Sequence, residues 1–176
     1  MLATAVFLVT RPSGGPAGGA AIGGPFSLIS EDGREVTERD FAGGPILVFF
    51  GYTHCPDVCP TTLFDLSEVL KAVGADKKVA GLFVTVDPAR DTPGVLKEYL
   101  AAFDPRIRGL SGDDGRIAAV EKAFRVYAKK VPQDNGGYTM DHTALIYLMD
   151  KQGRFVSSFN LDRPPAEAAK ELARYL

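Results

Sequence analysis

Residues 46–60 read ILVFFGYTHCPDVCP and join an apolar run to the two cysteines of a 176-residue chain. The apolar residues 46–50 lie between Gly43-Gly44-Pro45 and Gly51, as is typical of a central strand that is buried on both faces. After the cysteines, apolar residues recur at helical spacing until Gly74, which suits a helix C-terminal cap: Leu63, Leu66, Val69, Leu70 and Val73. The cysteines are therefore predicted to lie between a central strand and its helix, where open α/β sheets bind ligands.

Strand and helix patterns alternate on both sides of this unit. The sequence predicts a hairpin at 26–36 around Glu31-Asp32-Gly33, a strand at 79–86, a helix from Thr92-Pro93 through Phe103, a helix after Asp113-Asp114, strands at 143–149 and 155–159, and a closing helix at 164–176. Residues 129–141 are predicted to form a mobile loop that ends at His142. This order predicts an α/β three-layer fold with a mixed central sheet flanked by helices and an extra N-terminal β-hairpin. Its final strand-strand-helix unit is similar to that of thioredoxin folds.

Composition and charge narrow the class of protein. Hydrophobic residues make up 45% of the chain and charged residues 24%, as in one soluble globular domain. The 20 basic and 22 acidic side chains give a net charge of −2, and no run of Lys and Arg exceeds two residues. Nucleic acid is therefore not predicted as a partner, because phosphate binding needs a concentrated positive patch.

The N-terminal segment differs from the rest of the chain. Residues 2–9 are mostly apolar but supply only about half of the ~20 residues that a membrane-spanning helix needs. Residues 12–25 are almost entirely Gly, Ala and Pro, which cannot form a packed core. We interpret residues 1–25 as the remnant of an apolar anchor followed by a tether, and 26–176 as the folded domain. The alternative is a disordered start without an anchor.

Cys55 and Cys59 are interpreted as chemically active. A disulfide between them would close a loop of about five residues and stabilise the fold by only ~2 kcal/mol, less than a bridge across a longer loop. Redox or metal chemistry is therefore favoured over a structural bridge, and two buried thiols are the remaining alternative. Amides at the start of a helix lower a thiol pKa, which would supply thiolate for either chemistry.

The spacing of the pair favours metal. If the segment is helical, cysteines four residues apart share one face, and both sulfurs can then converge on one ion. Redox enzymes of this fold usually have two residues between the cysteines and a cis-proline opposite, whereas residues 140–144 read MDHTA and contain His142 instead of proline. Cys55, Cys59 and His142 would make a site of two sulfurs and one nitrogen, which suits Cu(I) and also Cu(II) with weak additional ligands.

Other interpretations of these residues stay open. Zinc is the main competitor, although a structural zinc site wants four protein ligands. His142 alone could be satisfied by a carbonyl, and His54 is expected to point away from the metal. Asp141 is either an outer partner of His142 or the end of a turn.

Two further groups of residues are candidates near this site. Asp87 and Asp91 could tune the site electrostatically or dock a partner. The alternative for Asp91 is that it only starts a helix with Thr92-Pro93. A second group is predicted to be exposed and could bind an acidic partner: Tyr52, Pro56 and the Lys129-Lys130 pair. The alternative is that these are surface residues with no binding role.

Three sequence blocks together resemble a known family. They are GYTHCPDVCP at 51–60, VDPARDTP at 86–93 and DHT at 141–143, and they resemble the signature blocks of the SCO/SenC copper chaperones of cytochrome c oxidase assembly. The resemblance implies a thioredoxin-like domain that binds one copper per chain through Cys55, Cys59 and His142, and Asp87 and Asp141 stand beside these ligands. It also implies tethering on the periplasmic side of a bacterial inner membrane, by an anchor that is incomplete in this chain.

Two functions follow as hypotheses. The first is a copper metallochaperone that delivers copper to the binuclear site of oxidase subunit II, or another copper acceptor, or maintains its thiols. It would need an upstream copper donor and a thiol reductant. The alternative is a thiol-disulfide oxidoreductase in which Cys55 and Cys59 act on partner cysteines. Peroxide reduction is a weaker third interpretation, because the Pro-x3-Thr-x2-Cys pattern of peroxiredoxins is absent.

Overall fold

The computed structural model describes residues 21–134 and 136–176, and most of the predicted anchor and tether, residues 1–20, lies outside them. Within the described part, Ile22 packs on the domain and the Gly23 N–H donates to the Ala123 carbonyl at 2.9 Å. None of the helices there has the length and apolar character needed to cross a membrane.

A seven-stranded mixed sheet forms the centre of the domain, in the order β2-β1-β5-β4-β3-β8-β9. Its three central strands run parallel: β3 (Ile46–Gly51), β4 (Ala80–Thr85) and β5 (Ile107–Ser111). The outer strands pair antiparallel with their neighbours: β1 (Ser27–Ser30), β2 (Glu35–Thr37), β8 (Ile146–Met149) and β9 (Phe155–Ser158). The predicted mixed sheet and N-terminal hairpin are confirmed.

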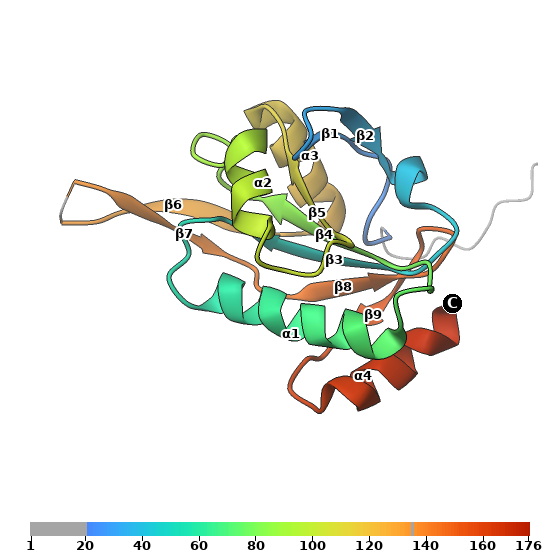
Figure 1. The fold of residues 1–176 in the computed structure, drawn as a ribbon. Helices are drawn as coiled ribbons and strands as arrows, with labels where there is room; N and C mark the ends of the chain where they lie inside the picture. The colour runs from blue at the N-terminus through green and yellow to red at the C-terminus, as the bar shows by residue number, and fades with distance from the viewer. Residues whose placement is uncertain (1–20, 135) are drawn as a thin grey trace, which may run out of the picture.

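Helices cover both faces of this sheet, which completes the predicted thioredoxin-like three-layer fold. One core holds side chains of α1 (Val58–Val73), α2 (Pro93–Leu100) and α4 (Pro165–Leu172), and the other holds α3 (Asp114–Phe124). Figure 1 shows α1 and α4 side by side. Alternate residues of β3 enter opposite cores, Phe49 on the α1 side and Phe50 on the α3 side, so the apolar run is buried on both faces. Two short 3-10 helices, η1 (Glu38–Phe41) and η2 (Ala173–Tyr175), complete the elements.

One strand of the sheet was missed by the sequence analysis. β5 carries Arg108 and Gly109 in its middle, so neither an apolar run nor a clean alternation marks it. Gly109 is required by packing, because a Cβ there would lie 2.8 Å from Leu100 and 3.1 Å from Leu96 of α2. That helix ends at Leu100 rather than Phe103, and the closing helix ends at Leu172 before η2.

The expectation of a loop at 129–141 is wrong, because most of this segment lies in two paired strands. β6 (Ala128–Pro132) pairs antiparallel with β7 (Tyr138–His142), with Ala128 opposite His142 and Pro132 opposite Tyr138. The hairpin forms a separate two-stranded sheet and projects beyond the body of the domain (Figure 1). Its second strand ends at the predicted histidine ligand.

Candidate metal centre

The connection from β3 to α1 places both cysteines beside the end of the central strand. The Cys55 N–H donates to the Tyr52 carbonyl at 3.2 Å, and α1 then begins at Val58. Cys59 lies in the first helical turn, where its N–H donates to Cys55 Sγ at 3.4 Å. Both are free thiols, Cys59 fully buried and Cys55 half-buried.

Gly51 makes room for the buried sulfur. A Cβ at this position would lie 2.8 Å from Cys59 Sγ and 2.6 Å from the Phe83 ring, closer than real Cβ contacts. The central strand can therefore end directly against the Cys59 thiol only with glycine at its last residue.

His142 meets Cys59 from the other side. Its Nε2 lies 4.0 Å from Cys59 Sγ, and its Nδ1 lies 3.1 Å from the Thr143 carbonyl. A carbonyl can only accept, so the contact with Thr143 assigns a proton to Nδ1, and Nε2 is the ring nitrogen that faces the sulfur. The Tyr52 ring stands edge-on to the imidazole, with 5.8 Å between ring centroids.

The sulfur-to-nitrogen distance fits a shared metal ion. With bond lengths of about 2.3 Å to sulfur and about 2.0 Å to nitrogen, a trigonal ion would separate these two atoms by about 3.7 Å. The 4.0 Å separation is therefore within a small side-chain movement of coordination. Across 21–134 and 136–176, however, no group of three His, Cys, Asp or Glu residues is spaced as a ready metal site.

Burial raises the pKa of the Cys59 thiol more than the Tyr52 backbone lowers it, and the neighbouring Cys55 adds a further increase. For Cys59 the expected lowering by the helix start is wrong, because loss of solvent outweighs the favourable amides. A metal ion must therefore displace the Cys59 proton to bind there.

Asp91 holds the cysteine loop, a role that sequence reasoning missed. It is fully buried and accepts hydrogen bonds from the Thr53 N–H at 3.1 Å, the Thr53 hydroxyl at 2.6 Å and the Thr85 hydroxyl at 2.6 Å. The loops after β3 and β4 are thus tied through one carboxylate. The position of this aspartate just after a buried strand was the available signal.

The remaining candidates lie around the ligands at different depths. Asp87 is buried and accepts from the Tyr138 hydroxyl at 2.9 Å, while Asp141 is exposed on β7 opposite Lys129. His54 is exposed, with Nδ1 3.1 Å from the Thr53 hydroxyl. Tyr52 was expected at the surface, but it is buried, and its hydroxyl lies 2.6 Å from that of Thr139.

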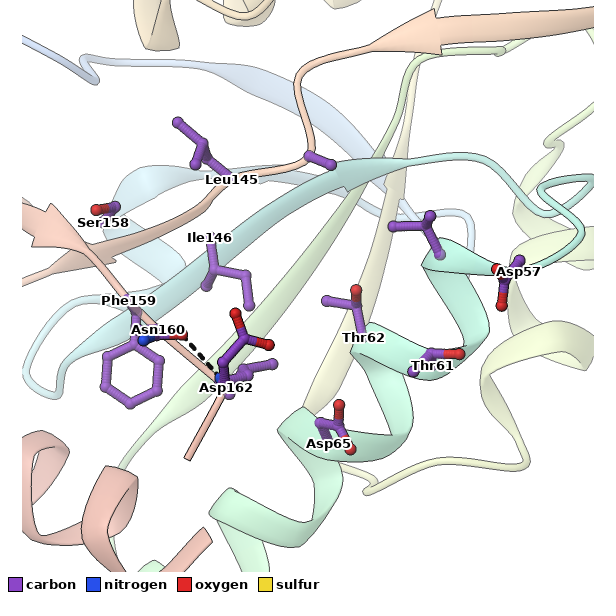
Figure 2. A pocket seen from close by; sticks show the side chains of 13 residues that line it. Asp57, Thr61, Thr62, Asp65, Leu145, Ile146, Ser158, Phe159, Asn160 and Asp162 are labelled. Carbon is purple, nitrogen blue, oxygen red and sulfur yellow. Dashed lines mark hydrogen bonds between the residues drawn. The ribbon is translucent and has the colours of Figure 1, made fainter. Parts of the chain in front are cut away.

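A pocket of about 640 Å³ adjoins the segments that carry the ligands. Figure 2 shows it between the first turns of α1, the connection from β7 to β8 and the residues after β9. Asp57 and Val58, which lie between the two cysteines, line it together with Leu145, three residues beyond His142. Val58 and Leu145 are 48% and 50% exposed, so apolar surface borders the candidate site.

Comparison with known proteins places these residues in a family context. A sequence model of the family described as SCO1/SenC matches residues 14–176. The structure of Bradyrhizobium japonicum ScoI with copper bound is 62% identical with a TM-score of 0.86, and covers 89% of this chain and 100% of that chain.

Two curated relatives show the extent of the match. The chain is 39% identical to a SCO2-like protein of Rickettsia felis, across 83% of this chain and 73% of that protein. It is 38% identical to the mitochondrial SCO1 homolog 1 of Arabidopsis thaliana, across 92% of this chain and 50% of that protein. The chain therefore spans about half the length of the Arabidopsis relative.

Proposed function

Because the chain belongs to the SCO1/SenC family, we propose that it is a copper-binding metallochaperone of cytochrome c oxidase assembly. Copper is its cargo, one ion per chain, held by Cys55, Cys59 and His142. The observation that carries this proposal is that His142 Nε2 faces Cys59 Sγ at 4.0 Å while Nδ1 lies 3.1 Å from the Thr143 carbonyl. The copper-bound ScoI structure, at 62% identity, supports copper as the ion.

The three proposed ligands, two cysteines and one histidine, account for both the binding and the release of copper. Two thiolates and an imidazole suit three-coordinate Cu(I), and weak additional ligands would accommodate Cu(II). Cys59 is fully buried and Cys55 is only half-buried, so the outer thiolate is the one that a partner ligand can replace first. Copper would therefore leave by stepwise ligand exchange that begins at Cys55.

The acceptor in this proposal is a copper site of cytochrome c oxidase, specifically the binuclear site of subunit II. An upstream donor would load the chain, and a thiol reductant would keep the cysteines open, since an oxidised pair cannot bind the ion. The domain would act on the periplasmic side of the bacterial inner membrane, tethered through its N-terminal segment. The apolar residues 2–9 and the Gly, Ala and Pro residues at 12–25 support that placement.

Anaerobic titration of the reduced protein with Cu(I) tests the proposal. We expect one tightly held copper per chain, at least tenfold weaker binding after His142→Ala, and loss of binding after Cys55→Ser or Cys59→Ser. His54→Ala is the matched control, because His54 adjoins Cys55 but is exposed and bonded to Thr53, and it should bind copper as the parent does. A folded, reduced protein that retains no copper would contradict the proposal.

The second candidate is thiol-disulfide exchange by the same cysteines. The half-buried Cys55 lies in the loop before α1, and its sulfur accepts from the N–H of the buried Cys59 in the first helical turn. This arrangement resembles an attacking and a resolving thiol. His142→Ala separates the two functions, because it should weaken copper binding while dithiol exchange continues. Exchange with a model disulfide that is fast in the parent and unaffected by this substitution would favour the second candidate.

A further inference from the structure

A cluster of polar and aromatic side chains joins the end of β4 to the strand that carries His142. The Arg90 guanidinium donates through Nε to Asp87 Oδ2 and through Nη1 to the Tyr138 carbonyl at 3.1 Å. The Tyr138 hydroxyl donates back to Asp87 Oδ1 at 2.9 Å. Arg90, Asp87 and Tyr138 thus form a closed ring of contacts, which we call the Arg90 clamp.

The clamp also grips the aromatic ring of Tyr138. The Arg90 guanidinium carbon lies 3.7 Å from the ring centroid, and the Lys130 ammonium lies 3.8 Å from it. Arg90 reaches the Tyr52 ring as well, at 5.6 Å. The Arg90 side chain is only 23% exposed, so its contacts with the two rings form away from bulk water, where they are stronger, whereas Lys130 is exposed.

The position of the clamp along β7 connects it to the metal site. Tyr138 begins this strand and His142 ends it, and the hairpin is a sheet of its own outside the seven-stranded sheet. Next to Tyr138, the Thr139 hydroxyl bonds the Tyr52 hydroxyl, and the Tyr52 ring in turn contacts His142. The side-chain contacts at Tyr138 and Thr139 therefore fix the strand against the cysteine loop.

We propose that Arg90 is a positioning residue for the copper site, which acts through Asp87 and Tyr138 to hold β7 so that His142 faces Cys59. The proposal deepens the proposed function and rests on it for the identity of the ion. Arginine suits this role because its planar fork bonds a carboxylate and a carbonyl together while its face stacks on a ring. When the clamp opens, His142 moves with the strand and the ion keeps its two thiolates.

Arg90→Gln tests the clamp, with Arg106→Gln as a closely matched control. Arg106 is 19% exposed and bonds a nearby carboxylate, Asp104, and a backbone carbonyl, Gly74, as Arg90 does. It precedes β5 at the opposite end of the parallel strands, where it cannot influence His142 directly. Any general cost of losing a half-buried arginine should therefore appear in both variants.

Two measurements report on His142. In the metal-free protein, the cross-relaxation between the Tyr52 and His142 rings should weaken at least severalfold in Arg90→Gln and stay unchanged in Arg106→Gln. In the Cu(I)-loaded protein, X-ray absorption should lose the scattering of a coordinated imidazole, and copper retention against a chelator should fall about tenfold. Tyr138→Phe, which removes only the bond to Asp87, should give a smaller effect in the same direction.

The outcomes separate this proposal from the proposed function. Undiminished Tyr52–His142 cross-relaxation and imidazole scattering in folded Arg90→Gln would overturn the clamp and leave copper binding standing. If the parent itself holds no copper, the proposed function fails, and the metal-free measurement still decides whether Arg90 positions His142. Equal losses in Arg90→Gln and Arg106→Gln would show a general structural effect and would also overturn the clamp.

Discussion

At the scale of single residues, the proposed ligand Cys59 would couple copper binding to protons. Burial raises the pKa of its thiol, so the group is protonated at neutral pH in the metal-free protein. Copper needs the thiolate, and each ion bound must therefore release this proton. The apparent copper affinity should rise by about tenfold per pH unit for each proton displaced. Competition with a chelator of known pH dependence, between about pH 6 and about pH 8, measures this slope. An affinity that stays flat over that range would contradict the prediction.

At the scale of elements, Asp91 unites the loops that follow β3 and β4. Asp91→Ala would leave the Thr53 N–H and the Thr85 hydroxyl without their acceptor, at a cost of about 1–3 kcal/mol for each buried group. We expect a loss of roughly 3 kcal/mol in the free energy of unfolding of the metal-free protein, measured with denaturant, and weaker copper binding because the cysteine loop shifts. Asp113→Ala removes a carboxylate that caps α3 at the surface and should cost only about 1 kcal/mol. Equal losses in the two variants would argue against a special role for Asp91.

Several helices and strands could be predicted from local sequence patterns, and others could not. The run at residues 46–50, the helical spacing after Cys59 and the Thr92-Pro93 start are strong local patterns, and each became the expected element. β5 was missed because Gly109, which close packing against α2 requires, interrupts its apolar pattern. β7 was missed because the side chains that contact it come from segments far away in the sequence. The candidate ligand set was visible as cysteine spacing plus one histidine. The contacts of Asp91 with the cysteine loop and of Arg90 with β7 join segments far apart in sequence, which no local pattern records.

At the scale of the whole molecule, the parallel strands separate the metal site from a stabilising ion pair. The cysteine loop follows the last residue of β3, whereas Asp104 and Arg106 precede the first residue of β5, at the opposite end. There Arg106 bonds both carboxylate oxygens of the buried Asp104, and the Asp104 backbone N–H donates to the Ser67 hydroxyl of α1. Stability and metal binding should therefore respond independently to changes at this end.

Asp104→Asn tests that separation through pH. The bond from Arg106 holds the pKa of Asp104 below its usual value, so the carboxylate stabilises the fold above about pH 4 and that contribution is lost as the pH falls below it. The parent should exceed the variant in unfolding free energy by about 1–3 kcal/mol at pH 7, and this difference should shrink as the solution is acidified. Copper stoichiometry and affinity at pH 7 should be the same in both proteins, because the substitution lies at the far end of the sheet.

Denaturant unfolding at several pH values, together with a copper titration, checks both statements. A stability difference that persists at low pH would show that Asn disturbs packing rather than charge, and a change in copper affinity would show that the two ends of the sheet are coupled.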